Sequence, residues 1–462
     1  MDKARSGNPF MEDISKAGRP AGLTFILLMI ICLFVFCQQT LDAPNLTQIG
    51  TGFGLAGPAI DEIIGGKSFM WQMVVISVSL ILFGYLSDMT NRKMLLGISL
   101  LLAGVSYLFA SFARTPEQFI IFRSLGGIGI GGFVPVMFSI IGDMFSSKSR
   151  AAASGIFVAI VNIGYGNGFI LGGAIGSETA FGWRVSFQVQ SIILILLSCL
   201  FVLAGKLPAR GFADTRDATG SDITEYKGRI KFSDLKTILS IPTNLIFIIS
   251  CIIATMPMGY IQRFMVDYYS TDAGLGTGAA TLILLIVLSG SLIGDLIGGF
   301  FGDILHIKNP GYPAYLSAFA LFAGCILFLV FFAFDMRGST VLFLAIPIAI
   351  GFIASSFVEI PTPVSKAMML DVNLPENRGT ISALIQITAQ IGFGLGALIG
   401  VFGDDLAVML GLTPTRLFNF RLAVLILIPV GLSWILVAYT IKRDEKKAKE
   451  LMQKRIEQEL AD

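Results

Sequence analysis

The chain has 462 residues, of which 54% are hydrophobic and only 14% are charged. Soluble domains usually have about a quarter of their residues charged. This composition therefore excludes a soluble protein, a disordered chain, a nucleic-acid module and a secreted disulfide scaffold. The formal net charge of +2 indicates no polyanionic partner, so the lipid bilayer is the expected surroundings of most of the chain.

Twelve apolar runs are long enough to cross a bilayer, which takes about 20 apolar residues in a helix. In chain order they cover residues 22–46, 68–87, 94–112, 118–142, 151–175, 186–204, 242–266, 278–301, 312–333, 340–365, 379–402 and 419–440. A polar stretch separates the first six runs from the last six. We therefore expect an all-α membrane protein with twelve transmembrane helices in two six-helix bundles.

The polar stretches divide the chain into five parts. We expect a cytoplasmic N-terminus, a six-helix bundle, a cytoplasmic linker, a second six-helix bundle and a cytoplasmic tail at residues 1–20, 21–205, 206–240, 241–441 and 442–462, respectively. Lys and Arg concentrate in the two ends, in the linker and in the loops on the same side. The positive-inside rule then places both termini in the cytoplasm, and we expect the plasma membrane as the location.

The two groups of spans are copies of each other. Asp143 and Arg150 after span 4 correspond to Asp371 and Arg378 after span 10, with a constant offset of 228 residues. The same offset continues into the next span and relates Gly164, Gly166, Gly168 and Gly172 to Gly392, Gly394, Gly396 and Gly400. Two repeated halves with a substrate site between them near the bilayer midplane are typical of secondary transporters.

These motifs resemble the major facilitator superfamily over essentially the whole chain. Gly84, Asp88 and Arg92 resemble its signature between spans 2 and 3, although Met89 and Asn91 depart from it. The segment that begins at Arg123 resembles the RxxxGxG motif of span 4, and its continuation through Arg184 resembles spinster-type lipid transporters. The resemblance implies the fold of this superfamily, with two pseudo-symmetric bundles, and transport by alternating access.

Charged residues at membrane depth are candidates for function because their burial is costly. Arg123 lies deep in span 4, and Asp42 lies in the outer part of span 1. Spans 1 and 4 face the central cavity in the superfamily, so the resemblance implies an Asp42–Arg123 pair. The pair is either a coupling site, in which protonation of Asp42 releases Arg123 for an anionic group, or a permanent ion pair that fixes bundle packing.

One position departs from the spinster pattern and bears on proton coupling. Spinster-type proteins typically have a glutamate in span 4 where this chain has Ile130. Glu359 in span 10, followed by two prolines that break the helix, is a candidate to supply the carboxylate. The alternative interpretation is that Glu359 is a carboxylate on the cytoplasmic side, paired with Lys366.

The motif residues at the inner helix ends are candidates for a cytoplasmic gate. Their charges can pair between helices and close the inner side in the outward-open state. This predicted gate consists of Gly84, Asp88, Arg92, Asp143, Arg150, Asp303, Asp371 and Arg378.

Uncharged polar residues within the spans are candidates to line the cavity, and they fit contacts between helices equally well. These residues are Gln38, Gln39, Asn162, Gln386 and Gln390.

Enzyme motifs such as a phosphate-binding loop or HExxH do not occur in the sequence, and we expect neither catalysis nor a cofactor nor a bound metal. We expect a monomer that transports a small organic or amphipathic molecule, first of all a lysolipid-like anion, with coupling to protons. The alternatives are a facilitative or drug-type exporter without fixed ion coupling, and a receptor or scramblase on the same scaffold.

Overall fold

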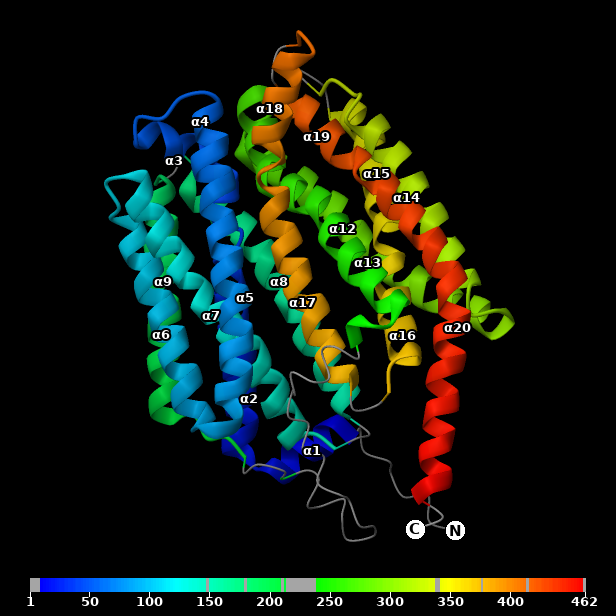
Figure 1. The fold of residues 1–462 in the computed structure, drawn as a ribbon. Helices are drawn as coiled ribbons and strands as arrows, with labels where there is room; N and C mark the ends of the chain where they lie inside the picture. Colours follow the sequence, from blue (N-terminus) through cyan, green and yellow to red (C-terminus); the bar gives the residue numbers. More distant parts are fainter. Residues whose placement is uncertain are drawn as a thin grey trace. The chain divides into compact units, whose positions relative to one another are not determined.

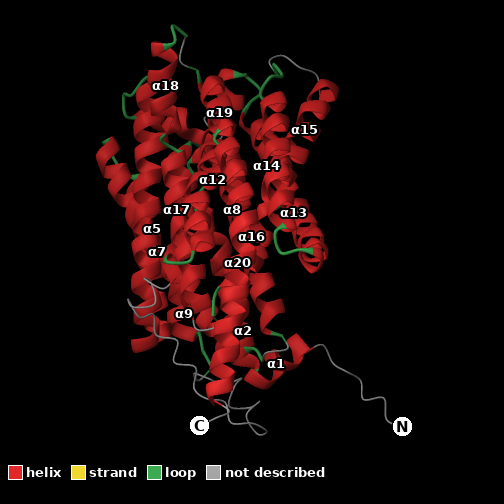
Figure 2. Ribbon diagram, turned by 45° about the vertical axis from the view of Figure 1, so that its right-hand side comes forward, coloured by secondary structure: helices red, strands yellow, loops and turns green. Residues whose placement is uncertain are grey.

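The computed structural model describes residues 9–146, 149–177, 181–208, 212, 238–336, 341–374, 377–412 and 415–459. These residues are helical and contain no strand (Figure 2). The chain divides into two compact units, Met1–Tyr226 and Lys227–Asp462. The boundary lies within residues 206–240, the stretch expected to link the bundles, most of which lies outside the described residues.

Unit 1 contains six long helices and several short ones, drawn from blue to green in Figure 1. In chain order they are α1 (Pro9–Ala17), α2 (Arg19–Cys37), η1 (Ala43–Asn45), α3 (Leu46–Gly52), α4 (Pro58–Ile60), η2 (Asp61–Lys67), α5 (Ser68–Met89), α6 (Arg92–Ser111), α7 (Pro116–Met144), α8 (Arg150–Gly176) and α9 (Trp183–Ala204). Here η1 is a 3₁₀ turn and η2 is π-helical.

Unit 2 repeats the series of spans with more interruptions, drawn from green to red in Figure 1. Its helices are α12 (Pro242–Asp267), the π-helical η3 (Tyr268–Asp272), α13 (Thr277–Lys308), α14 (Tyr312–Phe331), α15 (Val341–Glu359), α16 (Pro361–Val372), α17 (Arg378–Gly396), α18 (Ile399–Met409), α19 (Arg416–Leu425) and α20 (Leu427–Glu459).

The predicted number of spans is confirmed. Among the described residues, 11 helices are long and apolar enough to cross a membrane, and the bent pair α17 and α18 makes the twelfth. This pair bends by 41° at Ala397–Leu398, where we expected one continuous span over 379–402. Within span 10, the break between α15 and α16 at Ile360 lies where Pro361 and Pro363 predict it.

Span 1 differs from the expected continuous helix over 22–46. Helix α2 ends at Cys37, and irregular turns cover 38–42 before η1 and α3 begin. The backbone N–H groups of Gln38 and Gln39 donate to carbonyls three residues back, at 3.3 and 3.2 Å, instead of four. Pro44 then has no N–H with which to continue a helical ladder. The prediction missed this break because the apolar character of the sequence continues through it.

Several helices begin where a polar side chain caps the free N–H groups of the first turn. The Asn91 side chain accepts hydrogen bonds from the N–H groups of Lys93 and Met94 at the start of α6. The Thr115 hydroxyl likewise accepts from the N–H of Gln118 at the start of α7. These caps fix the N-terminal ends of α6 and α7.

The sequence repeat corresponds to a repeated packing contact inside each unit. In unit 1, Gly168 of α8 lies against the carbonyl of Cys37 so closely that a Cβ atom would overlap it. In unit 2, Gly396 of α17 lies in the same way against the carbonyl of Met256 in α12. Glycines at this spacing permit two membrane helices to approach at backbone distance, so both copies of this contact use the same device.

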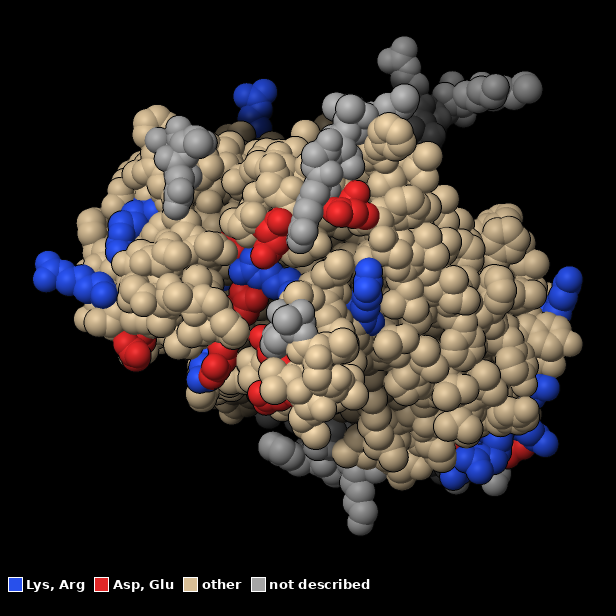
Figure 3. Space-filling view, turned by 90° about the horizontal axis from the view of Figure 1, so that it is seen from above, with Lys and Arg blue, Asp and Glu red and all other residues tan. Residues whose placement is uncertain are grey.

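Charged side chains are sparse on the surface seen in Figure 3, which views the structure from above and is mostly neither basic nor acidic. The charges that do occur include both signs. This agrees with a chain whose membrane-spanning helices leave many large apolar side chains, such as Leu203 and Ile307, exposed at their surface. Exposed apolar side chains of this kind are the surface that lipid tails cover.

Candidate functional site

A buried ion pair joins the break that follows α2 to the N-terminal part of α7. The Asp42 carboxylate lies 2.8 Å from Arg123 Nε and accepts a hydrogen bond of 3.0 Å from Arg123 Nη2. Both side chains are 0% exposed within the structure. One guanidinium thus contacts both oxygens of one carboxylate, through a hydrogen bond from Nη2 and through the charge contact at Nε, which makes no hydrogen bond of its own.

The remaining donors of Arg123 bind backbone carbonyls that the local fold leaves available. Arg123 Nη1 donates to the Ser68 carbonyl at 3.0 Å, and Nη2 also approaches the Gln39 carbonyl at 3.4 Å. The Phe69 ring lies 5.6 Å from the guanidinium carbon. Because the helical ladder is interrupted after Cys37, the Gln39 carbonyl is free to accept from a side chain. The break therefore contributes directly to the binding of the cation.

The two glutamines at the break make contacts within unit 1. Gln38 Nε2 donates to the Ala103 carbonyl of α6 at 3.3 Å, and Gln39 Nε2 lies 3.6 Å from the Met73 sulfur of α5. Both glutamines are buried. These contacts are those of polar residues that join helices, which was one of the two interpretations of the glutamines.

The other uncharged candidates lie apart from this network. Asn162 on α8 and Gln386 on α17 are exposed at the surface of their own units, whereas Gln390 is 7% exposed. Their role in lining a cavity stays a prediction.

Glu359 is the last residue of α15 and lies at the break in span 10. Its carboxylate shares a hydrogen bond with the Thr362 hydroxyl and lies within electrostatic range of Asp295 and Lys366. A Cβ at Gly294 of α13 would lie 2.9 Å from the Glu359 Cβ. Glu359 thus packs against α13 at the break in span 10, near the Asp295 carboxylate and the Lys366 ammonium group. Both interpretations of Glu359, as a proton site and as a partner of Lys366, stay open.

Within unit 1, the predicted gate residues form one clear interhelical pair. Arg92 of α6 forms an ion pair with Asp143 of α7 and donates to the Ser139 hydroxyl at 2.9 Å. Arg150 donates to the carbonyls of Gly142 and Phe145 at 2.8 and 3.2 Å, across the turn from α7 to α8. The start of α6, the end of α7 and the start of α8 are thereby connected by arginine side chains.

The remaining gate residues are less closely tied together. Gly84 leaves ordinary space, because a Cβ there would lie 4.0 Å from Pro135 Cβ. Asp303 is exposed, and Asp371 lies 3.8 Å from His306 Nε2. The side chains of Asp88 and Arg378 lie outside the described residues. The closing of a gate by these residues stays a prediction.

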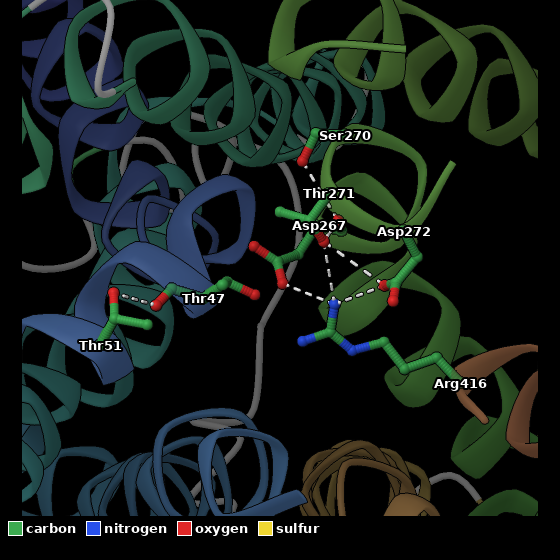
Figure 4. A network of polar contacts seen from close by, with 7 residues as sticks. All are labelled: Thr47, Thr51, Asp267, Ser270, Thr271, Asp272 and Arg416. Carbon is green, nitrogen blue, oxygen red and sulfur yellow. Dashed lines mark hydrogen bonds and ion pairs between the residues drawn. The ribbon is translucent and has the colours of Figure 1, made fainter. Parts of the chain in front are cut away.

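A charged cluster at the C-terminal end of α12 was not predicted from the sequence. Arg416 at the start of α19 lies 2.8 Å from Asp267 and 2.9 Å from Asp272 and holds them together (Figure 4). Arg263, one turn before Asp267, is 1% exposed. Neither Arg263 nor Arg416 was among the candidates named from the sequence, although Arg263 is buried in the structure. The sequence pattern that could have indicated this cluster is the spacing of four residues between Arg263 and Asp267, which places both side chains on one face of a helix.

A second missed contact binds the N-terminal segment to the turn between α7 and α8. The Asp13 carboxylate of α1 accepts hydrogen bonds from the Ser146 N–H at 3.0 Å and from the Ser146 hydroxyl at 2.6 Å. It also accepts from the Ser149 hydroxyl at 2.5 Å. Phe10 stacks on Phe145 with the ring centroids 5.0 Å apart. The N-terminal segment, predicted only as a cytoplasmic stretch, thus contains a docked helix at Pro9–Ala17.

Comparison with known proteins agrees with this architecture. The family model of the Major Facilitator Superfamily matches residues 27–397. Protein spinster homolog 1 of Xenopus tropicalis is 24% identical over 437 residues, which cover 87% of this chain and 80% of that protein. Protein spinster of Drosophila melanogaster is 28% identical over 223 residues, 47% of this chain, and the match spans only 34% of that protein's length.

The fold is also that of a solved structure. The crystal structure of a bacterial homolog to the human lysosomal transporter Spinster, inward-facing and unoccupied, superposes with a TM-score of 0.78 at 18% identity. The superposition covers 92% of this chain and 98% of that one. The family match over most of the chain and the twelve spans lead to one conclusion: the protein belongs to the major facilitator superfamily of membrane transporters and is spinster-like.

Proposed function

We propose that this protein is a secondary active transporter that moves a small amphipathic anion, of lysolipid type, by alternating access with coupling to protons. The observation that carries the proposal is the fully buried Asp42–Arg123 pair at the break in α2. A buried pair of this kind is not reliably stabilising, and charges at membrane depth are otherwise rare. Their burial is therefore better explained by a working cycle than by packing.

In the proposed mechanism, Asp42 and Arg123 exchange partners. With Asp42 ionised, Arg123 is held by the carboxylate and by the carbonyls of Gln39 and Ser68. Protonation of Asp42 removes the opposing charge and makes the guanidinium available to an anionic headgroup. Loss of that proton from Asp42 restores the ion pair and displaces the substrate from Arg123, so that proton and substrate movements are linked.

The test is uptake of a fluorescent lysophosphatidylglycerol into proteoliposomes, with and without an imposed pH gradient, and with lysophosphatidylcholine as the zwitterionic control. We expect accumulation of the anionic probe that depends on the gradient. Asp42→Asn should abolish this accumulation and leave downhill exchange intact. Glu359→Gln should do the same only if Glu359 is also a proton site. If both variants still concentrate the probe by means of the gradient, neither residue carries the proton.

The second candidate is a facilitative or drug-type exporter without fixed ion coupling. Ile130 favours it, because this side chain is buried in α7, two turns from Arg123, and provides no second carboxylate there. Transport by the wild type that ignores the pH gradient would select this candidate. Lysolipid movement without saturation or competition would instead indicate a scramblase, and binding without movement would indicate a receptor.

The remaining features of the proposal concern location. We propose that both termini are cytoplasmic, that the protein functions as a monomer and that it resides in the plasma membrane. The support for the orientation is that Lys and Arg concentrate at both ends, in the linker and in the loops expected on the same side of the membrane. Protease accessibility of tags at each terminus in oriented membrane vesicles tests the orientation directly.

A further inference from the structure

The segment 38–42, at the break in α2, is held by side chains from several helices. As described above, α6 binds the Gln38 side chain and Arg123 of α7 binds the Gln39 carbonyl. The Thr40 hydroxyl donates to the Tyr165 carbonyl of α8 at 2.7 Å. The segment is therefore anchored almost residue by residue, although it lacks the hydrogen bonds of a regular helix.

Tyr107 of α6 makes the contact nearest the start of the break. Its hydroxyl donates to the Gln38 carbonyl, and it accepts a hydrogen bond of 2.7 Å from Gln72 Nε2 of α5. Tyr107 and Gln72 are both 0% exposed. The hydroxyl thus connects α5 and α6 to the carbonyl that an unbroken α2 would have used in its own helical ladder.

The ring of Tyr107 is fixed by two further features. It stacks on Phe187 of α9 with centroids 5.3 Å apart and an interplanar angle of 12°. A Cβ atom at Gly126 of α7 would overlap the ring, so this glycine, directly before the first glycine of the RxxxGxG motif, makes the space that Tyr107 occupies. A ring held on two sides leaves its hydroxyl little freedom to point elsewhere.

We propose that Tyr107, oriented by Gln72, is a positioning residue for Asp42: it fixes the break in α2 and thereby places the carboxylate against Arg123. Gln38 lies four residues before Asp42 along the anchored segment, so displacement of one end moves the other. The importance of Tyr107 for transport rests on the function proposed above. The placement of Asp42 by Tyr107 is independent of that function and is measured without substrate.

The experiment uses Cys37, the native cysteine at the end of α2, as a reporter. Cys37 is 0% exposed, and Cys325, buried in unit 2, is the internal reference. N-ethylmaleimide labelling of the purified full-length protein is followed at each cysteine by peptide mass spectrometry. The variant is Tyr107→Phe, which keeps the ring and removes only the hydroxyl. The matched control is Tyr315→Phe, whose hydroxyl bonds to Tyr439 in unit 2.

Tyr107→Phe should raise the labelling rate of Cys37 about fivefold and leave that of Cys325 unchanged. A fivefold change corresponds to about 1 kcal/mol at 1.4 kcal/mol per factor of ten, which is the usual net value of one hydrogen bond. Gln72→Met should give a smaller increase in the same direction, and Tyr315→Phe none. Unchanged labelling of Cys37, or equal increases at Cys37 and Cys325, would overturn the proposal.

Coupling to Asp42 is measured by a double-mutant cycle on the same labelling rate. If Tyr107 positions Asp42, the effects of Tyr107→Phe and Asp42→Asn should deviate from independence by threefold or more, a prediction of about 0.7 kcal/mol. If the double variant changes the Cys37 labelling rate by the product of the two single effects, the proposal that Tyr107 positions Asp42 is wrong. Where lysophosphatidylglycerol is transported, Tyr107→Phe should also shift the pH profile of uptake with little change in KM.

The outcomes separate the two proposals. A wild type that does not transport the probe, or an Asp42→Asn variant with normal coupling, contradicts the proposed function and leaves the labelling cycle to decide the positioning. If transport depends on Asp42 but the effects of Tyr107→Phe and Asp42→Asn on the Cys37 labelling rate are independent, the positioning proposal alone is contradicted.

Discussion

The two units share a fold repeat but place their buried charges differently. In unit 1 an ion pair of 0% exposure, Asp42–Arg123, lies at a break in its first span. In unit 2 the Arg416–Asp267 pair lies at the start of α19 and the end of α12, and Glu359 lies at a break in span 10. A duplicated scaffold therefore does not imply duplicated chemistry, and in our proposal the coupling belongs to unit 1.

The packing of the second and fourth spans shows the same inequality. In unit 1 the glycines lie on the fourth span, where Gly131 of α7 brings a Cβ position within 2.6 Å of the Ile76 carbonyl of α5. In unit 2 they lie on the second span, where Gly290, Gly294 and Gly298 of α13 approach carbonyls of α15 and the break that follows it. In both units the second and fourth spans approach closely, but the glycines lie on the fourth span in unit 1 and on the second span in unit 2.

The largest effect is expected from breaking the buried pair of unit 1. Asp42→Ala leaves Arg123 buried without its carboxylate, which should cost about 3–5 kcal/mol in the free energy of unfolding. In unit 2, Asp272→Ala removes one carboxylate partner of Arg416. The Asp272 side chain is 45% exposed, so its loss should lower the free energy of unfolding by under about 1 kcal/mol. Denaturant titration in mixed micelles measures both. Equal losses would show that the two units do not differ in this respect.

An intermediate effect is expected from filling the glycine contact of unit 2. Gly294→Ala places a methyl group against the Ser356 carbonyl and should cost about 1–3 kcal/mol in the free energy of unfolding. Gly299→Ala on the same helix has nothing within 4 Å of its new Cβ and is the matched control. If Gly131→Ala in unit 1 costs the same as Gly294→Ala, the two interfaces are equally tight in spite of their opposite glycines.

The smallest effect concerns the inner pair of unit 1. Arg92→Gln removes the ion pair with Asp143 and should raise the labelling rate of a cysteine placed at Gly155 of α8 about fivefold, which corresponds to about 1 kcal/mol. Lys93→Gln is the control, because the described residues give Lys93 no ion-pair partner. A folded Arg92→Gln variant with unchanged labelling would remove Arg92 from the gate.

Much of the fold follows from the sequence because the bilayer imposes simple rules. Span length and the 228-residue repeat depend on hydropathy and on glycine spacing, which one sequence displays directly. The Asp42–Arg123 pair was implied by resemblance, and the structure brings the two residues together. Resemblance carries such a contact because related chains of one fold place the same helices side by side.

The missed features depend on tertiary contacts that no local pattern encodes. The end of α2 at Cys37 arises where carbonyls find partners on other helices, such as Tyr107 and Arg123. The docking of α1 requires Asp13 to meet Ser146, which is 133 residues away in the chain.

The early end of α2 has an electrostatic consequence. A helix of this length carries the equivalent of roughly −0.5 elementary charge at its C-terminus, and α2 ends at Cys37, directly before the segment that binds Arg123. Arg123 therefore faces the negative pole of the α2 dipole as well as the Asp42 carboxylate. In the proposed cycle, neutralising Asp42 removes only part of the negative potential around the guanidinium, so an anion would meet a cation that is already partly compensated. Under that proposal Arg123 binds its anion weakly and reversibly, as release of the substrate requires.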